Sequence, residues 1–412
     1  MIDTGSFTLD NGLRVVHHLD ASTPMMAVNV LYNVGAKDEN PEHTGMAHLF
    51  EHLMFGGSAN IADFDRAIEL AGGWNNAWTT NDYTNFYDVL PAANAETAFW
   101  AESDRMLALA FSDKALEVQR QVVVEEFKQT CLNRPYGDIG HLLRGLIYKV
   151  HPYRWPTIGL TPDHILGVCQ EDVRDFFYSH YAPNNAVLAV AGNISFEHTR
   201  ELAQKWFGNI PPREIAPRTY SMEPAATEPR RLEVTRDVPS TCIAIAYPMM
   251  PYGHPLYEAA DILTDILSTG TSSRFQLELV AKGNILTEAD ASILGSDDPG
   301  YMLVTGRLAD NSAATLEMAE TALHEQLDRI ASGGVSADEL KRAVNKFESN
   351  LVFNNIGFLA RAQAIAMSTI HSEDINDILP RYNRLTPDNI TAAAREIIRS
   401  EACRTLIYKS EH

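Results

Sequence analysis

At 412 residues the chain is too long for one ordinary hydrophobic core, so two or more domains are expected. Its 33 Lys and Arg residues against 54 Asp and Glu residues give a net charge of −21. This balance argues against a nucleic-acid partner, because phosphate binding needs clustered cations. No apolar stretch approaches the length of a membrane-spanning helix, so no membrane partner is expected.

The N-terminal residues, MIDTGSFTLDNGLRVV, have the pattern of a β-hairpin with a tight turn at Asn11 and Gly12. They lack the basic and apolar regions of a signal peptide, which favours the cytoplasm, or the periplasm if a signal has been removed. The four cysteines are far apart and form no CxxC pair, so buried free thiols are predicted.

Both halves of the chain open with the same order of elements. In the first, the apolar run MMAVNVLYNVG precedes a helix predicted from about Thr44; in the second, STCIAIAYPMM precedes a helix predicted from about Leu256. This parallel indicates an internal duplication. Mixed helices and strands predict an α+β fold in which helices cover a sheet. Further helices are expected over 92–109 and 313–330, and further strands over 186–191 and 300–306.

A Pro-rich segment, IPPREIAPRTYSMEPAATEP, lies between the two halves and has the composition of an inter-domain linker. We therefore expect an N-terminal metal-binding catalytic domain over residues 1–212, a linker over 213–231, and a C-terminal homologous domain without a metal site over 232–412.

The strongest motif is HxxEH, formed by His48, Glu51 and His52 within TGMAHLFEHLMFGG. On a helix the two histidines lie one turn apart on one face, so two imidazoles can bind one ion. Glu51 stands beside them, where a general base for the attacking water belongs. HxxEH is the inverted form of the commoner zinc-peptidase motif. The alternative is a helix with two surface histidines and a glutamate.

A catalytic zinc takes three protein ligands and keeps one open position, so a further ligand must come from elsewhere. The segment ALEVQRQVVVEEFKQT, residues 115–130, predicts a helix that ends in Glu125 and Glu126. A carboxylate ligand there would offset part of the charge of the dication. The alternative is that both glutamates belong to a solvated helix face.

At this point the sequence resembles the pitrilysin-type family of zinc peptidases, family M16, and in size its small bacterial two-domain branch. The resemblance rests on GMAHLFEHLMFGG, GGWNNAWTTNDYTNFY, RQVVVEEF and HPYRWPTIG, and it covers nearly the whole chain. It implies two homologous α/β-sandwich domains, each with a mixed, largely antiparallel sheet covered by helices. Together they would form one half of a clamshell around a chamber.

The resemblance implies that His48, His52 and a glutamate of the VVVEE segment bind one Zn²⁺ per chain, with Glu51 as the base. Matching the family pattern ERxVVxxE to this segment selects Glu126, with Glu125 as the alternative. The family places another glutamate seven residues before the ligand glutamate. Gln119 stands at that position here, so a carboxylate cannot assist from it.

Residues 76–79 resemble the edge strand that lies beside the zinc in this family. An edge strand has unpaired backbone groups, so a peptide substrate can bind as one more strand. The resemblance therefore implies substrate contacts at Asn76 and Ala77. The alternative is a turn at the two preceding glycines, capped by the asparagines.

The second half lacks the HxxEH motif but keeps GTSSRF, which resembles the family's GxxSRL. Where the family has an Arg and a Tyr that contact substrate, this chain has Val280 and Thr287. We therefore favour a homologous partner subunit that supplies the Arg and Tyr, with a homodimer of altered substrate binding as the alternative.

The expected function is that of a zinc-dependent endopeptidase acting on peptides or unfolded segments, as the catalytic subunit of a heterodimer. The alternative from another class is a non-catalytic structural subunit related to the processing peptidases. A metal-binding protein without hydrolytic activity would leave Glu51 without a role.

Overall fold

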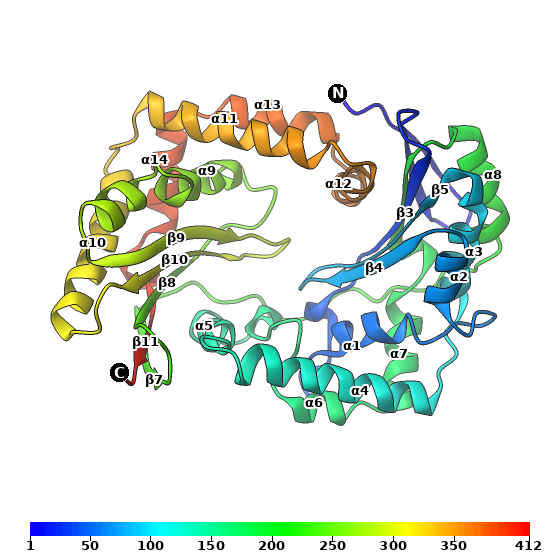
Figure 1. Cartoon of the computed structure of the whole chain (residues 1–412), viewed down its shortest axis with the longest axis horizontal. Helices are drawn as coiled ribbons and strands as arrows, with labels where there is room; N and C mark the ends of the chain where they lie inside the picture. The colour runs from blue at the N-terminus through cyan, green and yellow to red at the C-terminus, as the bar shows by residue number, and fades with distance from the viewer. The chain divides into compact units, whose positions relative to one another are not determined.

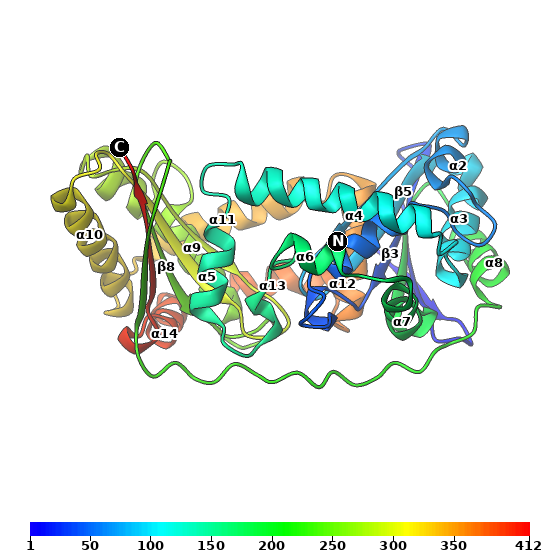
Figure 2. The ribbon, with the colours of Figure 1, turned by 90° about the horizontal axis from the view of Figure 1, so that it is seen from below.

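The computed structural model describes residues 1–412, which form two compact units. One unit combines Met1–Lys128, Trp155–Tyr220 and Leu351–Ile378, and the other combines Gln129–Arg154, Ser221–Asn350 and Leu379–His412. Each unit thus draws on both halves of the sequence, which differs from the contiguous ranges 1–212 and 232–412 expected above. Residues 211–229 contain no helix or strand and run as an extended green segment in Figure 2.

The first unit is built on a six-stranded sheet with the order β1-β2-β6-β3-β5-β4. β2 and β6 pair in parallel and the other neighbours are antiparallel. The expected hairpin at the N-terminus is present as β1 and β2, with Gly12 at a φ of 87° in the turn. The strands are β1 Gly5–Thr8, β2 Arg14–Leu19, β3 Met25–Tyr32, β4 Trp74–Thr79, β5 Thr84–Pro91 and β6 Ala186–Gly192.

Helices cover both faces of this sheet (Figure 1). Val28 and Val30 of β3 belong to the large core beneath α1 and α3, whereas Ala27 of the same strand packs with Ala362 of α12. Burial on both faces explains why β3 reads as a nearly continuous apolar run. The helices of this unit are α1 Met46–Leu53, α2 Phe64–Leu70, α3 Ala95–Leu107, α4 Asp113–Phe127, α6 Pro162–Leu166, α7 Gln170–His180, α8 Phe196–Phe207 and α12 Phe358–Ile370.

The second unit has a five-stranded sheet with the order β7-β11-β8-β10-β9, in which β7 and β11 are parallel. Leu143 and Ile147 of α5 pack against one face of this sheet, beside Ala244 and Leu406 (Figure 1). The strands are β7 Arg230–Arg236, β8 Cys242–Pro248, β9 Leu286–Leu294, β10 Tyr301–Leu308 and β11 Arg404–Ser410. The helices are α5 Ile139–Ile147, α9 Tyr257–Ser268, α10 Ala313–Ala331, α11 Ala337–Asn354, α13 Ile378–Asn383 and α14 Pro387–Ile397, and α11 runs across the unit boundary.

The two sheets repeat one topology. Five consecutive strands of the first, β2 to β6, are arranged as 2-6-3-5-4, and the five of the second, β7 to β11, are arranged as 7-11-8-10-9. α5 and α12 hold equivalent places, since each precedes the last strand of its half and packs on the sheet of the other half. The expected duplication and α+β class are confirmed, and the exchanged helices explain why neither unit is contiguous.

The four cysteines are free, as expected, but they are not all buried: Cys169 at the start of α7 is exposed. No helix of the structure is both long and apolar enough to cross a membrane.

Candidate metal centre

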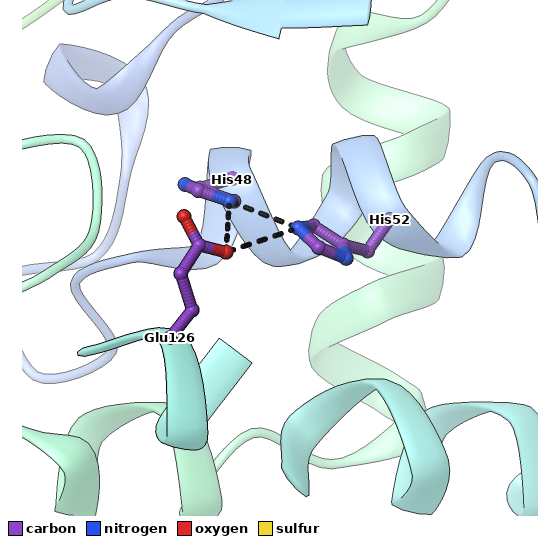
Figure 3. Close-up of side chains that lie close together, drawn as sticks. All are labelled: His48, His52 and Glu126. Carbon is purple, nitrogen blue, oxygen red and sulfur yellow. Dashed lines mark hydrogen bonds and ion pairs between the residues drawn. The ribbon is translucent and has the colours of Figure 1, made fainter. Parts of the chain in front are cut away.

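α1 presents the HxxEH motif on its exposed face. The helix begins after Gly45, which has a φ of 91°, and its apolar residues are buried in the core of the first unit. His48 and His52 lie on the opposite side, with 16% and 25% of their side chains exposed. Their rings stack with centroids 4.9 Å apart, and their Nε2 atoms are 2.9 Å apart (Figure 3). The packed face therefore fixes the helix while both imidazoles stay accessible.

α4 brings Glu126 to these histidines. Its Oε2 atom lies 3.4 Å from Nε2 of His48 and 3.6 Å from Nε2 of His52 (Figure 3). Glu125 is exposed and pairs with Lys128 instead. Of the two adjacent glutamates, the structure thus places Glu126 with the histidine pair and Glu125 away from it.

The three ligand atoms fit a zinc ion. They all lie within 4.8 Å of one another, and this is the one such group of His, Cys, Asp and Glu side chains in the structure. Bonds of about 2.0–2.2 Å in a tetrahedral arrangement require ligand atoms about 3.3–3.6 Å apart. The two distances from Glu126 to the histidines, 3.4 and 3.6 Å, lie in that range, and the 2.9 Å between the two imidazole nitrogens is shorter.

The electrostatics of the cluster couple the three side chains. Burial lowers the pKa of His48, but its hydrogen bond to Glu126 and the nearby charges outweigh this, so the pKa is raised overall. Hydrogen bonds from His48 and His52 hold the pKa of Glu126 well below its usual range. Glu126 is therefore ionised, as a carboxylate ligand of a cation must be.

Glu51 is not part of the cluster, but it lies close enough for its charge to act on His48. Its Oε2 atom accepts a hydrogen bond from Oγ1 of Thr79 at 2.5 Å. Thr79 is the last residue of β4, so this bond joins α1 to the edge strand. Neither the pattern HxxEH nor any spacing in the sequence indicates this contact, and it was not predicted.

β4 is the edge strand of the first sheet, and it contains Asn76 and Ala77. Asn76 is exposed and its Oδ1 accepts the backbone N–H of Ala77 at 2.8 Å. The side chain of Ala77 packs against the core that also holds α1. Both residues thus lie on the strand beside Glu51, with Asn76 directed to solvent.

The N-terminus of α1 is held by a buried carboxylate that the sequence analysis did not single out. Glu39 accepts the backbone N–H groups of Gly45 and Ala47 at 2.9 and 2.8 Å. Burial raises the pKa of Glu39 well above its usual value, while these two bonds act in the opposite direction. Since Gly45 has no side chain to cap the helix, Glu39 supplies the cap from six residues upstream.

The remaining positions named from the sequence lie outside the cluster. Gln119 is half-buried on α4, two turns before Glu126 on the same face of the helix. Val280 is half-buried near the end of the π-helical segment Phe275–Ala281. Thr287 is exposed near the start of β9.

Two family models match the sequence. One, described as "Insulinase (Peptidase family M16)", covers residues 14–134, and the other, described as "Peptidase M16 inactive domain", covers residues 168–347. His48, His52 and Glu126 all lie in the first range and none lies in the second. The chain is also 30% identical over 343 residues to zinc protease PqqE of Helicobacter pylori, an alignment that covers 82% of this chain and 77% of the relative.

Solved structures share the fold over the whole chain. A protease from Helicobacter pylori has a TM-score of 0.93 at 26% identity, covering 99% of this chain and 100% of that one. The periplasmic protease PqqL from Escherichia coli has a TM-score of 0.82 at 18% identity. That match covers 99% of this chain but 48% of PqqL, so the present fold corresponds to about half of that longer protein.

Proposed function

Because the chain belongs to peptidase family M16, we propose that it is a zinc metalloendopeptidase that hydrolyses internal bonds of peptides or unfolded segments. One observation carries the proposal. Three ligand atoms from α1 and α4 converge within 4.8 Å, and the carboxylate of Glu51 stands beside them. The alternative is that the two histidines merely belong to a solvated helix face. That alternative gives no reason for Glu126 of a second helix to lie against both of them.

His48, His52 and Glu126 would hold one Zn²⁺. When bound, zinc supplies Lewis acidity, which makes water more acidic and polarises a peptide carbonyl. Glu51 accepts the proton of the attacking water and later donates it to the leaving amine. Its carboxylate can take this role because it is not among the three ligand groups.

The substrate would bind along β4 as an added strand. The strand has no neighbour beyond it in the sheet, so its outer backbone groups are available to a peptide. This mode uses main-chain hydrogen bonds at Ala77, beside the exposed side chain of Asn76, and therefore favours extended peptides over folded proteins. Asn76 has to release the N–H of Ala77 before a peptide can pair there.

A homologous partner chain would complete the active enzyme. Two features support this proposal: the present fold corresponds to about half of the longer PqqL, and the family's substrate-contacting Arg and Tyr are replaced here by Val280 and Thr287. Neither side chain can donate a charge or a phenol. The catalytic subunit would then supply the metal site, and its partner would supply the Arg and Tyr.

The peptidase proposal is tested by zinc analysis together with a quenched-peptide assay. We expect zinc in the purified chain. With the partner present, we expect peptide hydrolysis that is abolished by a chelator and restored by zinc. Glu51→Gln is expected to keep zinc but to lose at least about 100-fold in kcat, because no carboxylate accepts the proton. His48→Ala and His52→Ala are expected to lose the metal itself. A Glu51→Gln variant with the parent's rate would refute the base assignment.

The partner proposal needs a separate comparison. The chain is assayed alone and after mixing with a homologous chain that is encoded beside it, lacks HxxEH and carries the Arg and Tyr. Activity that appears only in the mixture supports the heterodimer. Full activity of the chain alone rules the partner out and favours the homodimer.

A further inference from the structure

One side-chain hydrogen bond, between Thr79 and Glu51, joins the edge strand β4 to α1, the helix that carries the HxxEH motif. The hydroxyl donates to Oε2 of Glu51 at 2.5 Å, and both side chains are half-buried. Hydrogen bonds to a carboxylate group are about twice as strong as those between neutral groups. The bond therefore fixes one oxygen of Glu51 and restricts the rotation of its side chain.

The backbone of Thr79 faces the free edge of the sheet. The N–H of the next residue, Thr80, donates to the carbonyl of Tyr83 at 2.8 Å, so this pair belongs to the β4–β5 ladder. Bonded and non-bonded pairs alternate in an antiparallel ladder. Thr79 and Ala77, paired with Thr84 and Phe86, are therefore non-bonded to β5 and direct their N–H and C=O groups outward.

A second contact supports this register. The N–H of Ala77 is accepted by Oδ1 of its own neighbour Asn76 rather than by β5, as expected for a group on the outer side. A peptide added to β4 would thus pair with the backbone of Ala77 and Thr79. Thr79 combines two roles at one position: its main chain belongs to the peptide-binding edge and its hydroxyl holds the base.

We propose that Thr79 is a positioning residue whose hydroxyl orients Glu51. The position of Glu51 is thereby coupled to the register of a peptide bound along β4. The proposal rests on the proposed peptidase function. The hydroxyl holds Oε2 and leaves Oε1 of Glu51 to accept the proton of the attacking water. Because the bond comes from the substrate-binding strand, the base moves with the strand that fixes the scissile bond.

The neighbouring threonine provides a matched control. Thr80 uses its hydroxyl within the turn, where it accepts the N–H groups of Asp82 and Tyr83 at 3.1 and 3.0 Å. The hydroxyl bonded to Glu51 is that of Thr79, not that of Thr80. Thr80→Val therefore removes a hydroxyl that supports the same strand end without touching the base.

The test compares Thr79→Val, Thr79→Ser and Thr80→Val in the zinc-loaded chain with its partner, if one is required. Valine keeps the shape and β-branching of threonine, and serine keeps the hydroxyl. We expect Thr79→Val to lower kcat by about 10- to 100-fold with little change in KM, because the base loses its fixed orientation. Thr79→Ser is expected to stay within about threefold of the parent, and Thr80→Val to keep the parent's kcat while lowering the melting temperature.

Two further measurements do not depend on turnover. Zinc content is expected to be the same in all variants. In the inactive Glu51→Gln background, adding Thr79→Val is expected to leave the Kd of a labelled peptide unchanged within about twofold, since the hydroxyl is assigned to the base and not to the peptide.

Several results would overturn the proposal: an unchanged kcat in Thr79→Val, an equal loss in Thr80→Val, no rescue by serine, loss of zinc, or a weaker peptide Kd. A parent chain that shows no zinc-dependent hydrolysis, either alone or with the homologous partner, would instead refute the proposed function. Failure of the positioning role of Thr79 is therefore distinguishable from failure of the proposed peptidase function.

Discussion

Glu125 and Glu126 are adjacent on α4 but have different surroundings. The side chain of Glu125 is 59% exposed and pairs with Lys128, whereas that of Glu126 is 38% exposed and lies against both histidines. Helical geometry turns successive side chains about 100° apart, so only one of the two can face α1. Which one does so depends on the rotation of α4, which its apolar residues fix by packing into the core.

This pair gives a prediction with an internal control. Glu126→Ala is expected to weaken zinc binding by at least about 100-fold, because it removes the one anionic ligand. Glu125→Ala, an identical change one residue away, is expected to leave zinc affinity and kcat/KM within about twofold. Competition against a chelator of known affinity measures both. Equal losses in the two variants would contradict the assignment of Glu126.

At the level of residues, the sequence predicts local relations well and distant contacts poorly. His48 and His52 are brought together because a spacing of four residues on a helix places them on one face. Glu126 was preferred to Glu125 only through a family pattern. The bond from Thr79 to Glu51 depends on how β4 lies against α1, and no periodicity in either segment carries that information.

Among the elements, α1 depends on a contact outside itself. It is an eight-residue helix whose cap position is a glycine, and isolated helices of this length are marginal in water. The buried carboxylate of Glu39 satisfies two of its N-terminal N–H groups, and the apolar face fixes the other side. The proposed metal ligands His48 and His52 are thus carried by a helix that its surroundings hold in place.

Removal of this cap is expected to affect both stability and metal affinity. Glu39→Ala leaves two buried N–H groups without acceptors and should lower the free energy of unfolding by about 2–3 kcal/mol. Zinc affinity should fall as well, because the N-terminus of α1 is no longer held in place.

Glu42→Ala, which removes an exposed carboxylate from the same loop, is the control and should change neither the free energy of unfolding nor the zinc affinity. Chemical denaturation of the metal-free protein and chelator competition provide the two measurements. Unchanged zinc affinity in Glu39→Ala would show that the cap is not needed to position His48 and His52 for zinc.

Element boundaries from the sequence differ from the structure by a few residues. The helix expected from about Thr44 begins at Met46, because Gly45 is in the left-handed region, and that expected over 92–109 is α3 Ala95–Leu107, preceded by a 3₁₀ turn. The strand expected over 300–306 extends to Leu308. Caps and turns decide such ends, and they depend on neighbouring segments as much as on local sequence.

For the whole molecule, composition indicates the linker but not the exchange of helices. The amphipathic pattern of α5 shows that one face is buried, yet it does not show which sheet covers it. The structure places α5, from the first half of the sequence, on the second sheet, and α12, from the second half, on the first. This is why the expected ranges 1–212 and 232–412 do not coincide with the compact units.

Cutting the linker is therefore expected not to separate the two pieces. A protease site introduced within residues 213–229 should give two fragments that still elute together in size-exclusion chromatography, because α5 and α12 remain packed on their sheets. The N-terminal fragment produced alone, ending at residue 212, should aggregate, since the face of its sheet that α12 covers is left exposed. A cleaved protein whose fragments elute separately, each folded, would support the contiguous domains instead.

The exchanged helices also determine how early the first unit can complete its folding during synthesis. The last strand of the first sheet, β6, ends at Gly192, but the helix that covers its second face ends at Ile370. The intervening 370 − 192 = 178 residues take roughly 9 to 36 s to translate at about 5–20 residues per second. During that interval the nascent N-terminal half carries an uncovered apolar surface outside the ribosome, where chaperones that shield such surfaces would act.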